Sequence, residues 1–254
     1  MGGPLASAVS TAAELLTAAR RDGRRLTELP DDARPRTIHD AYAIQDAVAA
    51  MLGPIRGWKV GAKSPSAEPT CAPLPANLIL RSPQRFACGR FAVNGVEAEL
   101  AFTLSRDLLP RPQPYCAADV RAAVATVHTA IEVVDSRFLD IGAVDALSLL
   151  ADFQSNGALV VDDGVALPQA FESSTQRVAL HIDGVDVLEG RGSNPAGDVL
   201  SLLAWLANHA AARSGGLRRG DIVTTGSWTG MRFVAAHTRV RATFAGIGGV
   251  DVEF

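Results

Sequence analysis

Residues 96–102 read VEAELAF, an alternation of apolar and acidic side chains that is typical of a β-strand. Successive side chains of a strand point to opposite faces, so Glu97 and Glu99 share one face. The simpler interpretation is an amphipathic strand whose glutamates lie in water. The alternative is a pair of carboxylates directed at one cation, because two unit charges about 4 Å apart repel by roughly 4 kcal/mol at an effective dielectric near 20. A site built from carboxylate oxygens favours Mg²⁺, Mn²⁺ or Ca²⁺ over zinc.

The segments around this strand predict a helical N-terminal part and a β-rich body. Residues 4–52 have apolar side chains at helical spacing, interrupted by a charged connector over residues 26–36. Thr37 is the expected N-cap of a second helix that ends at Gly53-Pro54. Beyond Gly57, short apolar runs alternate with turn residues. We expect strands over Trp58–Val60, Val96–Leu104, Ile131–Val134, Gly157–Val161, Arg177–Ile182, Val185–Leu188, Ile222–Thr225, Val240–Phe244 and Val250–Phe254.

Three further features complete the predicted organisation. The pair Asp183-Gly184 is typical of a two-residue hairpin turn. Helices are expected over Ala117–Ala130 and Val199–Arg213, and the Pro-rich stretch Ser64–Pro83 is expected to be a long loop. The sequence therefore predicts an α+β protein, with a helical region over residues 1–55 and a β-rich catalytic domain over residues 56–254.

Composition excludes several classes of function. The chain has 254 residues, 48% hydrophobic and 20% charged, with a formal net charge of -3. It has no basic patch interleaved with aromatic residues, so a nucleic-acid partner is not expected. Its cysteines, Cys71, Cys88 and Cys116, have no CxxC spacing, which argues against a disulfide framework or a zinc site and fits a reducing cytosol. No apolar run approaches the roughly 18 residues of a membrane span, and the N-terminus is a poor signal peptide, so we expect a cytoplasmic protein without a membrane partner.

Two isolated charges in apolar runs are further candidate site residues. Glu132 lies in the run IEVVDSR of residues 131–137, where an uncompensated charge would cost several kcal/mol. A salt bridge and metal ligation explain it equally well. Lys59 lies in the run GWKVG of residues 57–61, either as a lysine at a strand edge or as a lysine within a site. In a site, loss of solvent would lower its pKa toward the range of a general acid or base.

The run GDIVTTGS of residues 220–227 predicts a strand that ends in hydroxyl groups and a glycine. An ordinary strand and turn is the simpler interpretation. The alternative is a strand end that offers N–H and O–H donors to a substrate carboxylate. Thr225, Gly226 and Ser227 are the candidate substrate-binding residues.

Together these motifs resemble the hydratase/decarboxylase branch of the fumarylacetoacetate hydrolase superfamily, which includes 2-keto-4-pentenoate hydratases and 4-oxalocrotonate decarboxylases. The resemblance runs from about residue 35 to the C-terminus. Each motif is weak alone, but their order is specific. The motifs are GWKVG (57–61), EAE (97–99), IEVVDSR (131–137), WLAN (205–208), GDIVTTG (220–226) and IGGV (247–250).

The resemblance implies a mixed β-roll core preceded by a helical region, and a Mg²⁺ or Mn²⁺ ion held by Glu97, Glu99 and Glu132. It implies that Lys59 is the active-site lysine and that Thr225 and Gly226 lie at the substrate side. The implied activity is that of a lyase of aromatic catabolism that hydrates a 2-keto-4-pentenoate-like acid. The alternatives are decarboxylation of a 2-oxo diacid such as 4-oxalocrotonate or oxaloacetate, and a non-catalytic partner subunit. A homo-oligomer is expected, and association with a related hydratase or decarboxylase subunit is possible in such a family.

The sequence departs from the family pattern in the loop after the lysine. Hydratases of this branch carry an acidic residue there, in a Pro-Asp-Phe/Tyr-Gly-like run. In this chain Glu68 is the only carboxylate between Lys59 and Glu97, and it lies outside such a run. We expect Glu68 to act as the replacement acid if the reaction is hydration. The His–Glu dyad of the hydrolase branch has no counterpart, so C–C hydrolysis is not favoured.

Overall fold

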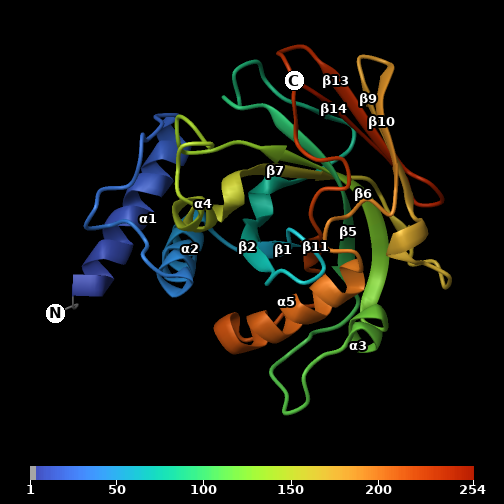
Figure 1. Cartoon of the computed structure of the whole chain (residues 1–254), viewed down its shortest axis with the longest axis horizontal. Coiled ribbons are helices and arrows are strands. Elements are labelled where there is room, and N and C mark those ends of the chain that lie inside the picture. Colours follow the sequence, from blue (N-terminus) through green and yellow to red (C-terminus); the bar gives the residue numbers. More distant parts are fainter. Residues whose placement is uncertain (1–3) are drawn as a thin grey trace.

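Most strands of the chain belong to one large curved sheet, as the computed structural model of residues 4–254 shows (Figure 1). Within those residues the sheet has nine strands. Its main order is β2 (Thr70–Pro75), β1 (Ile55–Gly61), β11 (Ile222–Thr224), β5 (Gly95–Leu104), β6 (Val124–Val134), β7 (Asn156–Val161) and β3 (Ile79–Arg81). The short strands β12 (Arg232–Phe233) and β8 (Val165–Ala166) pair with β5 and β6.

A second sheet of five strands lies at one side of the molecule. Its order is β10 (Val185–Arg191), β9 (Arg177–Ile182), β13 (Arg239–Phe244), β14 (Gly248–Glu253) and β4 (Gln84–Arg85). The turn between β9 and β10 has a positive φ at both Asp183 and Gly184, which confirms the predicted hairpin.

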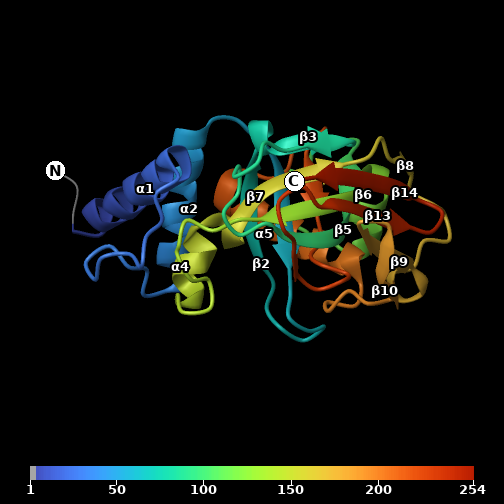
Figure 2. The ribbon, with the colours of Figure 1, turned by 90° about the horizontal axis from the view of Figure 1, so that it is seen from above.

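The helices α1 (Pro4–Asp22), α2 (Ile38–Leu52) and α4 (Ala146–Ala151) gather on the opposite side from β9 and β13, as both ribbon views show (Figures 1 and 2). The longer helix α5 (Val199–Ser214) contacts β1, and the short helix α3 (Ala117–Arg121) contacts α5. Three short 3₁₀ segments connect other elements: η1 (Ala76–Leu78), η2 (Phe153–Ser155) and η3 (Ser173–Thr175). None of the helices between residues 4 and 254 combines the length and apolar character that a bilayer crossing requires.

The two N-terminal helices begin and end much as the sequence predicts. The Thr37 hydroxyl accepts from the Asp40 N–H at 3.1 Å, and the Asp40 carboxylate accepts from the Thr37 N–H at 2.9 Å. This capping box satisfies two N–H groups at the start of α2, which confirms Thr37 as its N-cap. The first strand begins at Ile55. The division of the chain into two regions at residue 55 stays a prediction.

The pair β5 and β6 forms the centre of the large sheet. Val96, Ala98 and Leu100 on β5 are fully buried, so the apolar face of the VEAELAF run packs into the core as expected. The antiparallel register places Glu97 directly opposite Glu132. The sheet therefore determines which acidic side chains meet.

Two expectations from the sequence are wrong. The predicted helix Ala117–Ala130 ends at Arg121, and β6 starts at Val124. Residues 124–134 are rich in β-branched side chains, which pack better on a strand than on a helix. The predicted loop Ser64–Pro83 is a loop only in part, since β2, η1 and β3 lie within it. Its prolines are tolerated because β2 is an edge strand, while Cys71, Ala72 and Leu74 are buried against the core.

Candidate metal centre

Three carboxylates converge on the large sheet. One oxygen from each of Glu97, Glu99 and Glu132 lies within 4.8 Å of the other two. Glu97 and Glu99 are two residues apart on β5 and therefore share a face, and Glu132 is paired with Glu97 from β6. Glu99 and Glu132 are fully buried, and Glu97 is half-buried. The interpretation of the VEAELAF run as a strand with both glutamates in water is therefore wrong.

Lys59 reaches the same group from β1. Its Nζ donates to Glu132 Oε1 at 2.5 Å and to the carbonyl of Gln154 at 3.2 Å. Its side chain is 12% exposed. Lys59 thus faces the carboxylates, as one of its two interpretations required. With all four groups ionised, the three carboxylates and the ammonium would have a net charge of two negative units.

The mutual repulsion is visible in the pKa values. Burial, followed by the charge of Glu132, raises the pKa of Glu97 to about 7. Burial and the charges of Glu132 and Glu97 raise the pKa of Glu99 well above its ordinary value. Burial alone would lower the pKa of Lys59, but the charges of Glu132, Glu99 and Glu97 outweigh it, so the pKa is raised. The expected lowering of the lysine pKa is therefore wrong, because the carboxylates stabilise the ammonium.

Donors on neighbouring strands hold one oxygen of each buried carboxylate. Glu99 Oε2 accepts from the hydroxyl of Thr224 and from the Gly226 N–H, the latter at 3.1 Å. Glu132 Oε1 accepts from Asn156 Nδ2 at 2.9 Å in addition to Lys59. These contacts fix the two carboxylates against rotation and leave the second oxygen of each for another partner.

Those second oxygens provide the test of whether a metal fits. Glu99 Oε1 and Glu132 Oε2 are buried, and neither has a hydrogen-bond partner within the described part of the chain. A buried carboxylate oxygen without a partner costs free energy, so the arrangement is incomplete as it stands. A divalent cation would satisfy both atoms and balance the net negative charge of the ionised groups. The donors are hard oxygens, which suit Mg²⁺, Mn²⁺ or Ca²⁺. The residues fit the metal.

The candidate substrate-binding residues Thr225, Gly226 and Ser227 have different contacts at this strand end, and their role in binding substrate stays a prediction. Gly226 contacts Glu99. A hydrogen bond from Ser227 to Glu97 opposes the rise in the pKa of Glu97 but does not outweigh it. Thr225, however, donates its hydroxyl to the Leu100 carbonyl at 2.9 Å. Thr224, which the sequence analysis did not select, presents its hydroxyl to the carboxylates. The alternation of side chains along β11 could have identified Thr224, had the register with β5 been known.

A strained turn supplies two further residues that the sequence analysis missed. Phe153, Gln154 and Ser155 all have positive φ, a conformation that costs a non-glycine residue about 1 kcal/mol or more. The turn places the Gln154 carbonyl against Lys59 and sends Asn156 into β7 beside Glu132. No sequence signal predicts three consecutive left-handed residues without glycine.

A buried ion pair anchors the start of this turn. Arg137 Nε donates to Asp152 Oδ1 at 2.6 Å, and the Arg137 N–H donates to Asp152 Oδ2 at 3.0 Å. Their side chains are 4% and 3% exposed. Strained backbone persists only where the surrounding structure holds it, and this ion pair provides such support beside the turn.

The structure does not bring Glu68 to the carboxylates. Its side chain is exposed, and its Oε1 accepts from Trp205 Nε1 on α5 at 2.8 Å. Trp205 in turn stacks on His209, with ring centroids 4.7 Å apart. Glu68 would have to leave Trp205 to act in the site, and its catalytic role stays a prediction.

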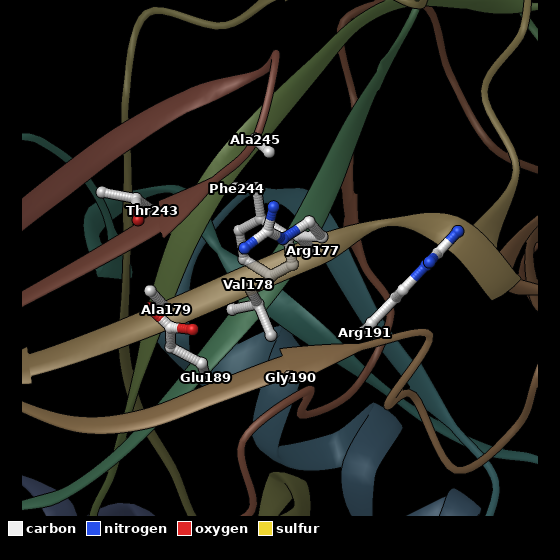
Figure 3. A pocket seen from close by; sticks show the side chains of 9 residues that line it. All are labelled: Arg177, Val178, Ala179, Glu189, Gly190, Arg191, Thr243, Phe244 and Ala245. Carbon is white, nitrogen blue, oxygen red and sulfur yellow. The ribbon is translucent and has the colours of Figure 1, made fainter.

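A hollow of about 450 Å³ on the smaller sheet lies apart from this chemistry (Figure 3). Its charged lining residues are Arg177, Glu189 and Arg191. None of the converging glutamates lines it, and it gives no support to a catalytic role.

Comparison with known proteins identifies the family. Residues 50–253 match the family described as "Fumarylacetoacetate (FAA) hydrolase C-terminal". The chain belongs to the fumarylacetoacetate hydrolase family. A 2-keto-4-pentenoate hydratase of Paraburkholderia phymatum is 32% identical over 225 residues, covering 84% of this chain and 85% of the relative. 2-Keto-4-pentenoate hydratase 1 of Dechloromonas aromatica is 31% identical and covers 98% of both chains.

A solved structure extends the likeness to three dimensions. The 4-oxalocrotonate decarboxylase of Pseudomonas putida G7, in complex with magnesium and adipate, has a TM-score of 0.86 to this chain at 26% identity. The likeness covers 97% of each chain. These findings confirm the expected family, and the α+β fold of the fumarylacetoacetate hydrolase type follows from them.

Proposed function

We propose that this chain is a divalent-metal-dependent lyase of small 2-oxo acids, and that it hydrates a 2-keto-4-pentenoate-like acid. The observation that carries the proposal is the convergence of Glu97, Glu99 and Glu132 beside Lys59, with two buried carboxylate oxygens that have no partner among residues 4–254. Relatives named 2-keto-4-pentenoate hydratase, matched over nearly the full chain, support hydration as the main reaction.

In this proposal Glu97, Glu99 and Glu132 hold one Mg²⁺ or Mn²⁺ ion. When bound, the ion would supply Lewis-acid polarisation of the 2-oxo group. Thr224 and Gly226 keep Glu99 in its orientation, and Asn156 does the same for Glu132. Because these donors already hold one oxygen of each carboxylate, little reorganisation is needed when the ion binds.

Lys59 is the proposed proton carrier of the site. The surrounding carboxylates keep its ammonium charged, so a proton is available at Nζ. The Gln154 carbonyl and Glu132 Oε1 fix the position of that ammonium. Hydration also requires a second group that places or deprotonates water. Glu68 is the proposed second group, and it can serve only if its loop leaves Trp205.

Decarboxylation of a 2-oxo diacid is the second candidate, and two observations favour it. The structure closely matches that of a 4-oxalocrotonate decarboxylase, with a TM-score of 0.86. In addition, Glu68 lies against Trp205 and not in the site. Loss of CO₂ requires an electron sink but no positioned water, so an ion held by the converging glutamates, together with Lys59, would suffice for it.

Product identification separates the candidates. The protein, with or without Mg²⁺, is incubated with 2-hydroxypenta-2,4-dienoate or with 4-oxalocrotonate, and the products are identified by mass spectrometry. We expect a product that has gained one water from the dienoate, and only with metal. Glu132→Gln should abolish it, whereas Glu189→Gln, which removes an exposed acid on β10, should not. Release of CO₂ without addition of water would show that the reaction is decarboxylation and not hydration. A failure to convert either substrate would favour a non-catalytic subunit.

A further inference from the structure

A second cavity lies between the C-terminal part of α1, the end of α2 and residues 77–78, 89–92 and 135–137. Its volume is about 660 Å³, within the range of small-molecule sites. Five arginines line it, whereas its acidic lining residues are two, Asp22 and Asp135. The arginines are Arg20, Arg21, Arg25, Arg90 and Arg137.

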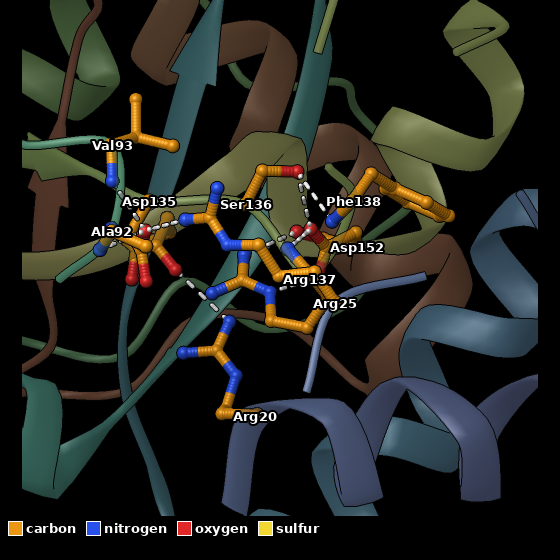
Figure 4. Close-up of polar contacts among 10 residues, drawn as sticks. Arg20, Arg25, Ala92, Val93, Asp135, Ser136, Arg137, Phe138 and Asp152 are labelled. Carbon is orange, nitrogen blue, oxygen red and sulfur yellow. Dashed lines mark hydrogen bonds and ion pairs between the residues drawn. The ribbon is translucent and has the colours of Figure 1, made fainter. Parts of the chain in front are cut away.

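Three of these arginines already have an acidic partner. Arg21 pairs with Asp22 at 2.8 Å, Arg25 with Asp135 at 2.7 Å, and Arg137 with Asp152. Asp135 shares its Oδ1 among three donors, because that atom also accepts from the N–H groups of Ala92 and Val93, both at 3.1 Å. Figure 4 shows the contacts of Arg25 and Arg137 with Asp135 and Asp152.

Arg20 and Arg90 remain without a counter-ion. Neither has a carboxylate within 4.0 Å among residues 4–254. Figure 4 shows the guanidinium of Arg20 turned toward those of Arg25 and Arg137 and toward Asp135. Burial, followed by the positive charge of Arg137, lowers the pKa of Arg20 to about 9; the charges of Asp152 and Asp135 oppose this shift only in part, and Arg90 adds to it. The cavity therefore has an excess of positive charge.

Arg20 is also held in place. Its Nη2 donates to the Asn156 carbonyl at 2.9 Å, and its guanidinium lies 5.7 Å from the ring centroid of Phe153. Arg20 lines the cavity, and this contact uses one of its five N–H donors. A guanidinium fixed by packing loses little entropy when it binds an oxyanion, and its planar fork suits carboxylate or phosphate oxygens.

We propose that this cavity binds a small dianionic oxyanion, with Arg20 and Arg90 as its ligands, at a site separate from the converging glutamates. The shared chemistry is that of a dicarboxylate or a phosphate, either of which would balance the two arginines. The site lies next to Asn156, which contacts Glu132 through its side chain and Arg20 through its carbonyl. The proposal does not depend on the proposed lyase function.

The test uses calorimetric titration of the full chain, stripped of metal and then desalted, at fixed ionic strength in NaCl. Succinate and inorganic phosphate are the two probes. We expect saturable binding of one anion per chain for at least one probe, and the preferred probe identifies the class. Arg90 is exposed, so Arg90→Gln should fold normally, yet weaken binding by about 10-fold or more, the usual effect of losing a charged hydrogen bond.

The matched control is Arg219→Gln, which removes the same charge from an exposed arginine outside the cavity. It should bind with the affinity of the parent. Arg20→Gln should lose binding as well, with folding verified by circular dichroism. The proposal is overturned if neither anion binds saturably to the parent, or if Arg90→Gln and Arg219→Gln bind with equal affinity.

Discussion

Replacing Glu99 by glutamine should have opposite effects on stability and on metal binding. In the metal-free protein Glu99 Oε1 is buried without a partner in the described residues, and Glu132 and Glu97 raise the pKa of Glu99. An acid whose pKa is raised on folding destabilises the protein as the pH rises above its unfolded value, here 4.5. A glutamine has no proton to take up, and it can keep the hydrogen bonds from Thr224 and Gly226.

The size of the stability change expected for Glu99→Gln follows from the linkage between protonation and folding. Between an unfolded pKa of 4.5 and pH 7, a carboxyl group whose pKa is raised on folding can lose at most about 3.5 kcal/mol of stability, at roughly 1.4 kcal/mol per pH unit. Glu99→Gln should recover a large part of that, which corresponds to a rise in Tm of about 5–10 °C for a chain of this size. At pH 5 the same cost is below about 1 kcal/mol, so most of the advantage should disappear.

The assay is calorimetric unfolding at pH 5 and pH 7, with and without Mg²⁺. Saturation of a site at about 100 times its Kd stabilises a protein by about 2.7 kcal/mol, so Mg²⁺ should raise the Tm of the parent and leave that of Glu99→Gln nearly unchanged. Glu189→Gln is the control, because it removes an exposed glutamate and should show neither effect. The reasoning is refuted if Glu99→Gln is no more stable than the parent at pH 7 without metal, or if Mg²⁺ stabilises both equally.

Three further substitutions test individual contacts. Lys59→Met should reduce turnover by about 10²-fold or more and keep metal binding, and turnover within a factor of two of the parent would remove Lys59 from the chemistry. Asp152→Asn leaves the buried guanidinium of Arg137 without its counter-charge, so unfolding in urea should show a loss of about 3–5 kcal/mol; a loss under 1 kcal/mol would contradict this account of the turn. Glu68→Gln still accepts from Trp205 but carries no proton, so in a hydratase kcat should fall by about 10²-fold with little change in KM. Trp205→Phe, which frees the loop acid, should not cause that fall, and equal hydration by Glu68→Gln and the parent would exclude Glu68 as the acid.

Local patterns in the sequence predict much of the fold. Alternation at residues 96–102 predicts β5 and the shared face of Glu97 and Glu99, and Thr37 with Asp40 predicts the start of α2. These features depend on neighbours in the chain, so one sequence is enough to find them. The sequence does not indicate where β6 starts. The Ala-rich residues before Thr126 fit a helix locally, whereas pairing with β5 makes this segment a strand.

Features that depend on distant parts of the chain could not be predicted. The register between β11 and β5 determines that Thr224, and not Thr225, presents its hydroxyl to Glu99. The role of Gln154 depends on its backbone carbonyl in a left-handed turn, which carries no residue preference that a single sequence reveals. The direction of the Lys59 pKa shift depends on how many carboxylates surround the ammonium, and only the assembled site gives that number.

The most direct test of the metal centre is a crystal structure of the protein grown with Mn²⁺, with anomalous diffraction used to locate the ion. The account predicts one anomalous peak per chain, within coordination distance of oxygens from Glu97, Glu99 and Glu132, and no such peak in Glu99→Gln at the same Mn²⁺ concentration. A peak elsewhere, or no peak beside these glutamates in the parent, would contradict it.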